Sequence, residues 1–243
     1  MANVWARDRA SSFYFFAGPL ALLVILIGFS TTYFLPMASG SFSAPFFVHL
    51  HGAACLGWVL LLIAQAWMVR STSTPRHRRL GVIALPLALT IWASGMATAG
   101  WAARRDFPEL GISAASGIVG TVTGLSIFLA LVVAAIICRK RPDWHKRLIL
   151  LATVALLWPA FFRWRHILPI VPRPEITLAL LLADSPILIA AIRDQLRFGR
   201  VHPVWAIFGT GLFVEQSIEL YLFDGSAWRQ LGQFFYDLLA MPL

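Results

Sequence analysis

The chain has 243 residues, of which 59% are hydrophobic and 13% are charged, and its formal net charge is +9. The apolar residues gather in long stretches, which is typical of a membrane protein. The basic residues are spread over short segments that flank these stretches, so the positive charge does not indicate nucleic-acid binding. The two cysteines, Cys55 and Cys138, fall in different stretches near opposite membrane faces, which argues against a disulfide between them.

Seven apolar stretches predict an all-α fold: a polytopic transmembrane helix bundle in one integral-membrane domain, residues 1–243. Most stretches carry the ~20 apolar residues that a helix needs to cross ~30 Å of hydrocarbon. They are continuously apolar rather than alternating, which favours helices over a transmembrane barrel. The predicted spans, in chain order, are residues 12–35, 46–69, 79–100, 113–138, 148–168, 175–196 and 203–223.

The distribution of basic residues predicts the orientation of the bundle. Of the 20 Lys and Arg residues, 14 lie in the N-terminal tail and in the connections after the second, fourth and sixth spans. An excess of basic residues marks the cytoplasmic side, so the N-terminus is predicted inside and the C-terminus outside. The tail, residues 226–243, has apolar residues at helical spacing, which predicts a short interfacial amphipathic helix on the outer surface.

The lipid bilayer is therefore the first expected partner. Its anionic headgroups are expected to attract basic residues on the cytoplasmic side by on the order of 1 kcal/mol each. The residues expected to contact these headgroups are Arg78, Arg79, Lys146, Arg147 and Arg200.

A histidine stands at the start of each span that begins on the cytoplasmic side. These are His77 in HRRLG, His145 in HKRLI and His202 in HPVW. A helix N-terminus favours the neutral imidazole, which is the form that ligates haem iron or copper. The three histidines are therefore predicted to bind a cofactor, haem b or copper. They could instead anchor helix ends at the headgroups or hold a lipid phosphate.

Polar residues also occur inside the predicted spans. His51, Cys55 and Gln65 share one face of the second span, and the four-residue spacing of His51 and Cys55 would allow a weak metal site. The sixth span carries Asp184 just before Pro186, which is expected to kink the helix.

Ionisable groups in hydrocarbon usually face the bundle interior and find a partner there. We therefore expect Asp184 to accept a hydrogen bond, with Arg163 as the first candidate donor. The cluster could relay protons, bind a cation or hold a polar ligand, or it could only fix helix register through salt bridges. The predicted buried polar cluster comprises His51, Gln65, Arg163, Asp184, Glu215 and Glu219.

The order of these motifs resembles a large family of uncharacterised bacterial polytopic membrane proteins. This resemblance covers roughly residues 46–228 and implies location in a bacterial cytoplasmic (inner) membrane, but no activity. Glu219 departs from the pattern, which has a basic residue there. The matching positions are His51, Trp58, Gln65, His77 to Gly81 (HRRLG), His145 to Leu148 (HKRL), Asp184, Asp194 and the GRxHP residues Gly199, Arg200, His202 and Pro203.

The histidine pattern favours a redox-linked membrane protein that binds haem b or copper. One alternative is a proton-coupled carrier or small-molecule sensor that uses the buried polar cluster. Another is a non-catalytic subunit or assembly factor with partner subunits in a membrane complex. The sequence leaves open whether the protein is an enzyme, because it contains no HExxH, CxxC or phosphate-loop motif, and its two lysines lie outside the seventh span.

Overall fold

The computed structural model describes residues 12–239, which form helices with no strand among them. The predicted all-α fold is therefore confirmed for this part of the chain. The N-terminal basic residues Arg7 and Arg9 and the last four residues of the predicted outer helix lie outside it. The long α-helices are α1 (Ser12–Phe29), α3 (Phe46–Arg70), α5 (Ala84–Leu110), α6 (Ser113–Ile137), α7 (Pro142–Arg163), α9 (Ala183–Phe198), α10 (Thr210–Leu222) and α11 (Ser226–Leu239).

Shorter elements extend or connect these helices. The short α-helices are α2 (Leu35–Ala38), α4 (Thr74–Gly81) and α8 (Pro174–Ile176). Three stretches are wound as π-helix: η2 (Ser30–Phe34), η5 (Thr177–Leu182) and η6 (Val204–Gly209). Two are single 3₁₀ turns: η3 (Cys138–Lys140) and η4 (Trp164–His166).

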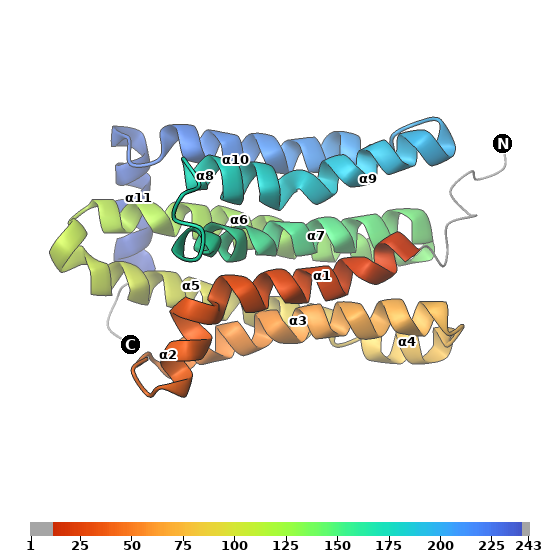
Figure 1. Cartoon of the computed structure of the whole chain (residues 1–243), viewed down its shortest axis with the longest axis horizontal. Coiled ribbons are helices and arrows are strands. Elements are labelled where there is room, and N and C mark those ends of the chain that lie inside the picture. Colours follow the sequence, from red (N-terminus) through yellow and green to blue (C-terminus); the bar gives the residue numbers. More distant parts are fainter. Residues whose placement is uncertain (1–11, 240–243) are drawn as a thin grey trace.

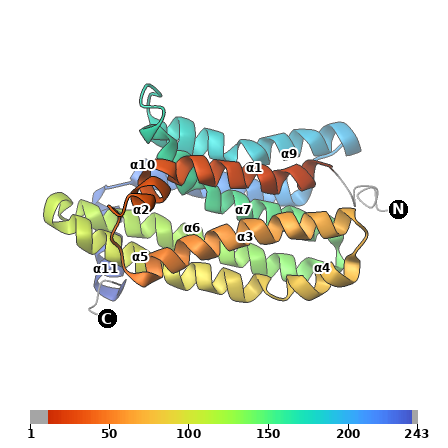
Figure 2. The same cartoon turned by 60° about the horizontal axis from the view of Figure 1, so that its bottom comes forward.

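The long helices run side by side, and α11 crosses one end of the bundle (Figures 1 and 2). The start of α1, the α3–α4 connection, the α6–α7 connection and the α9–η6 connection gather at the opposite end. We call this the basic end, because the connections there carry most of the basic residues. The end crossed by α11 is called the far end.

Six helical stretches within residues 12–239 are long and apolar enough to cross a membrane, as in an integral membrane protein. The seventh predicted span is also helical, as η6 followed by α10, and it lies beside α9 (Figure 1). It is less apolar than the other six because Glu215, Gln216 and Glu219 interrupt it. The six stretches are Ser12–Ala38, Phe46–Arg70, Thr74–Leu110, Ser113–Lys140, Pro142–His166 and Pro174–Phe198.

Helix α7 occupies the centre of the bundle. It packs against α1, α6 and α9, and Leu151 and Ala152 near its middle are completely buried. It begins six residues earlier than the sequence predicts, because Pro142 stands in its first turn and Asp143 follows there, both favourable at a helix N-terminus. A hydrogen bond of 3.1 Å from Trp58 Nε1 to Thr153 Oγ1 ties α3 to α7.

At the far end, α11 packs on α6 and α5. Gly232 approaches the backbone of Ala115, and Trp228 Nε1 donates a 3.1 Å hydrogen bond to the Ser116 carbonyl. The helix predicted for the tail is therefore present up to Leu239, and it is held against the bundle by specific contacts.

Close packing between α1 and α7 depends on Gly28. A methyl group at this position would collide with the carbonyl oxygen of Ala160. Small residues at such crossings let membrane helices approach through their backbones.

We expect Gly28→Ala to lower the free energy of unfolding by about 1–3 kcal/mol, because backbone atoms on α7 cannot move aside for the added methyl group. The measurement is chemical denaturation in detergent micelles. Gly117→Ala on α6 is the matched control, since nothing lies within 4 Å of the added carbon there. Equal destabilisation by the two substitutions would contradict the proposed packing constraint.

Candidate functional site

The most completely buried charges lie at the basic end, where α7 meets α9. Nε and Nη2 of Arg147 donate to the two carboxylate oxygens of Asp194, each at 2.9 Å. Both side chains are 0% exposed. Arg147 Nη1 also donates to the Asp143 carbonyl at 3.0 Å, so the guanidinium is held from several directions.

Asp194 joins further elements to this ion pair. Trp205 Nε1 in η6 donates to Asp194 Oδ2 at 3.0 Å, and Arg193 Nη1 donates to Oδ1 at 3.1 Å. Arg147 was expected at the headgroups, but it lies inside the bundle because it faces α9 rather than lipid. The sequence contained one signal for this network: Asp194 is one of very few acids among the basic connections.

His202 lies beside the ion pair and is only 1% exposed. Its Nδ1 accepts a 3.2 Å hydrogen bond from the Val204 amide, and its Nε2 lies 3.6 Å from Asp143 Oδ2. Burial, followed by the charge of Arg147, lowers the pKa of His202 to about 4, although Asp143 acts in the opposite direction. His202 therefore contacts Asp143 and the start of η6.

His77 and His145 face each other nearby, with ring centroids 6.3 Å apart. His145 Nδ1 donates to the Ala135 carbonyl at 2.8 Å, and the His77 ring is hydrogen-bonded to the backbone of Gln65. Within residues 12–239, His77 Nδ1 and both amide atoms of Gln65 are buried without a hydrogen-bond partner. The structure thus brings together two of the three predicted cofactor histidines, and it places Gln65 with them.

Asp184 is 5% exposed, as expected for a residue that faces the bundle interior. Neither of its carboxylate oxygens has a hydrogen-bond partner among the described residues, so the expected bond from Arg163 is not formed. The π-helix η5 ends two residues before Asp184, and Pro186 follows two residues later. π-Turns within α-helices often occur at functional sites.

Two further acids lie on α10 against α6. A methyl group on Gly120 would collide with the Glu219 carboxylate, so this glycine makes room for the acid. Glu215 lies next to Thr123 and close enough to both Asp184 and Glu219 for their charges to interact.

At the far end, Asp224 accepts hydrogen bonds from Ser113 at 3.0 Å and from Ser116 at 2.9 Å. The pKa of Asp224 lies well below its usual range, mainly because Arg229 donates hydrogen bonds to its carboxylate. We call the four carboxylates that follow one another from the far end into the bundle the acid row: Asp224, Glu219, Glu215 and Asp184.

The other members of the predicted polar cluster lie elsewhere. His51 Nδ1 is 3.1 Å from the Ile91 carbonyl, and its Nε2 is 3.6 Å from Cys55 Sγ, so the predicted adjacency of these two side chains is present. Arg163 Nη1 donates to the carbonyl of Pro159 in its own helix at 2.9 Å, and its guanidinium lies over the Phe29 ring. This fold-back onto α7 keeps Arg163 away from Asp184.

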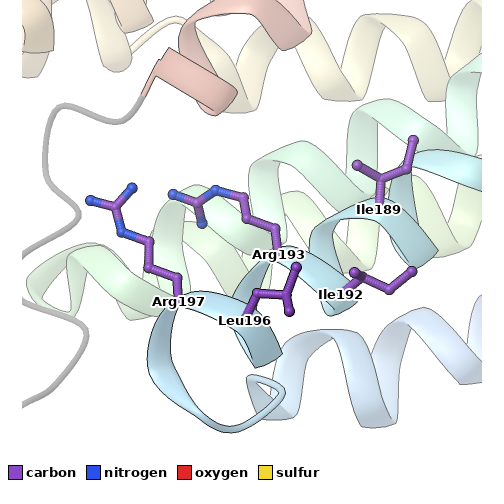
Figure 3. Close-up of a pocket in the computed structure, with 5 residues that line it drawn as sticks. All are labelled: Ile189, Ile192, Arg193, Leu196 and Arg197. Carbon is purple, nitrogen blue, oxygen red and sulfur yellow. The ribbon is translucent and has the colours of Figure 1, made fainter.

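The basic residues predicted to contact headgroups have different environments. Arg78, Arg79 and Arg200 are exposed at the basic end, whereas Lys146 lies 4.6 Å from the centre of the Tyr14 ring. The outer face of α9 also carries an open groove of about 540 Å³, with Arg193 and Arg197 extending beside it (Figure 3). Its other lining residues are Ile189, Ile192 and Leu196, which are exposed, so the groove is a surface feature rather than an enclosed site.

Within residues 12–239, no group of three or more His, Cys, Asp or Glu side chains is arranged to hold a metal ion. No protein-family model matches the chain, and no curated protein or solved structure shows significant similarity to it. Function must therefore be inferred from the side-chain geometry.

We expect Asp194→Ala to lower the free energy of unfolding by about 3–5 kcal/mol, because it leaves the Arg147 cation buried without its counter-ion. The control is Asp106→Ala, which removes an exposed partner of Arg105 and should cost less than about 1 kcal/mol. Chemical denaturation in micelles would measure both changes. A loss at Asp194 as small as that at Asp106 would contradict this account of the ion pair.

The buried His202 ring makes the stability of the folded protein depend on pH. The folded protein lowers the pKa of His202 from 6.5 to about 4, so folding favours the neutral ring. This contribution to stability is complete above pH 6.5 and should be lost as pH falls from 6.5 toward about 4. Thermal unfolding midpoints across this range should fall more steeply for the wild type than for His202→Gln. Parallel curves for the two proteins would refute the assignment.

Proposed function

We propose that this chain is a proton-coupled integral membrane protein, a carrier or a small-molecule sensor, whose acid row binds and relays protons. The observation that carries the proposal is the environment of Asp184. This carboxyl is buried, makes no hydrogen bond with the described residues and lies within electrostatic reach of a second acid, Glu215.

A buried carboxylate without a cationic partner costs far more free energy than the neutral, protonated acid in the same place. We therefore expect Asp184 to carry a proton in the resting state. Opening of the site to water, or arrival of a cationic ligand, would release that proton. The protonation state of Asp184 would in this way depend on the conformation of α9, which carries it.

The neighbouring glutamates extend this behaviour along α10. Because Glu215 interacts with both Asp184 and Glu219, ionisation of one acid opposes ionisation of the next. Along α10, Glu219 is ~6 Å from Glu215 by helical rise, and Asp224 follows the end of the helix at Leu222. Bridging water could carry protons across steps of this length. Asp224, held as the anion by Arg229 at the far end, would attract protons to the outer end of the row, and Glu219 would be the first acid to bind one.

The predicted topology gives this path a direction. Seven spans with the basic end in the cytoplasm, as the positive-inside rule favours, would place Asp224 on the outer side of a bacterial inner membrane. The acid row would then lead from the outside to the middle of the bilayer.

The sequence also favours a redox-linked role with haem b or copper shared among His77, His145 and His202. The contacts of His202 argue against its share in this role, because its Nδ1 accepts the Val204 amide and its Nε2 lies 3.6 Å from Asp143. No specific observation favours the third alternative, a subunit or assembly factor.

Infrared difference spectroscopy of the reconstituted protein would test the proposal. We expect the wild type to show a carboxylic-acid carbonyl band at neutral pH, because Asp184 is protonated in its buried site. Asp184→Asn should remove the component of this band that belongs to Asp184, and Glu215→Gln should shift the pH at which that component disappears, because it removes the neighbouring charge.

Asp106→Asn, an exposed acid outside the acid row, should leave the band unchanged. Absence of the band from the wild type, or a spectrum of Asp184→Asn identical to that of the wild type, would overturn the proposal. Proton uptake into vesicles under a membrane potential would then separate a carrier, which moves protons, from a sensor, which only binds them.

A further inference from the structure

His77 on α4 and His145 on α7 form a separate group at the basic end, which the acid row does not include. We infer that these two histidines bind a single Cu(I) ion between them. Gln65 of α3 lies against the same group, with its amide unpartnered among residues 12–239. This inference does not depend on the proposed proton-coupled function.

Both histidine rings are anchored by hydrogen bonds to backbone groups. His145 gives Nδ1 to the Ala135 carbonyl, which leaves the lone pair of Nε2 for a ligand. His77 is bonded to the backbone of Gln65 and has no partner at Nδ1. Metal-binding histidines have this arrangement: one nitrogen is anchored by a carbonyl, which fixes the ring, and the other is left for the metal.

The separation of the two ring centroids leaves room for one ion between the rings. A metal–nitrogen bond of ~2.0 Å plus the half-width of the ring puts a bound ion about 3.2 Å from each ring centroid. Two rings on opposite sides of one ion would then be about 6.3 Å apart, whereas a tetrahedral angle would bring them to about 5 Å. The observed centroid separation is 6.3 Å. With the ring planes at 85° to each other, this separation leaves room for one ion in line between the rings when Nδ1 of His77 and Nε2 of His145 are turned toward each other.

The small number of ligands at this place restricts which ion can bind. Zn(II) requires about four ligands in tetrahedral geometry, and the described residues offer no third His, Cys, Asp or Glu here. Cu(I) has a filled d shell and is stable with two nitrogen donors in line. It also carries a single charge, which suits a position near the Arg78 cation better than a divalent ion would.

Haem between the same two rings would need a slot wide enough for a porphyrin. A bare ion needs no such slot.

Anaerobic titration of the purified full-length protein tests the inference. Cu(I), kept reduced with ascorbate, would compete between the protein and a coloured Cu(I) chelator, with absorbance as the readout. We expect one Cu(I) per wild-type chain. His77→Gln and His145→Gln should each weaken binding at least about tenfold, because each removes one of two ligands.

His166→Gln is the matched control, since this histidine is exposed and lies just after α7 at the far end. It should bind Cu(I) like the wild type. Size-exclusion elution and circular dichroism establish that each variant is folded, and X-ray absorption of the loaded wild type should show two nitrogen ligands.

Three results would overturn the inference: no Cu(I) uptake by the wild type, uptake unchanged in both folded histidine variants, or purification with a Soret band that His77→Gln abolishes. The last would assign the pair to haem. None of these results alters the infrared band of Asp184, so the two proposals can fail independently.

Discussion

The buried ion pair of Arg147 and Asp194 is the constraint on which the basic end of the bundle depends. It links α7, the central helix, to α9, and Trp205 adds η6 to the same carboxylate. Removal of either charge alone would leave the other buried without a counter-ion, which strongly destabilises a fold. Because apolar helices in lipid lack a strong driving force to choose one rotation over another, a directional pair of this kind fixes their register.

The ion pair also helps to explain why Asp184 has no cationic partner among the described residues, whereas Asp224 at the far end pairs with Arg229. Arg147 is fully engaged at the basic end, and Arg163 bonds back to its own helix at Pro159. The buried charges are therefore separated. Arg147 and Asp194 neutralise each other at the basic end, whereas Glu215 and Glu219 lie against α6 closer to the far end. Asp184, which lacks such a partner, is best accommodated by taking up a proton or a bound cation, so its position points to function rather than to stability.

The apolar stretches predicted the helices well, because length and composition alone determine which segments can cross a bilayer. Spacing along one helix also predicted the adjacency of His51 and Cys55. Contacts between helices were less predictable. Gln65 was grouped with the buried acids but lies beside His77, and Arg147 was placed at the headgroups but is buried. Such contacts depend on the rotation of each helix about its axis, which a continuously apolar segment does not encode.

The π-helix η5 ends at Leu182, two residues before Asp184, so its position along the chain helps to set the direction in which the acid points. A π-turn holds one residue more than an α-turn, and it can move along a helix as hydrogen bonds exchange. Moving it past Asp184 would turn the acid by about 100° about the helix axis and advance it by ~1.5 Å. The segment from Leu182 to Pro186 could in this way change what its carboxyl faces while both ends of the helix stay in place, one of them fixed by Asp194.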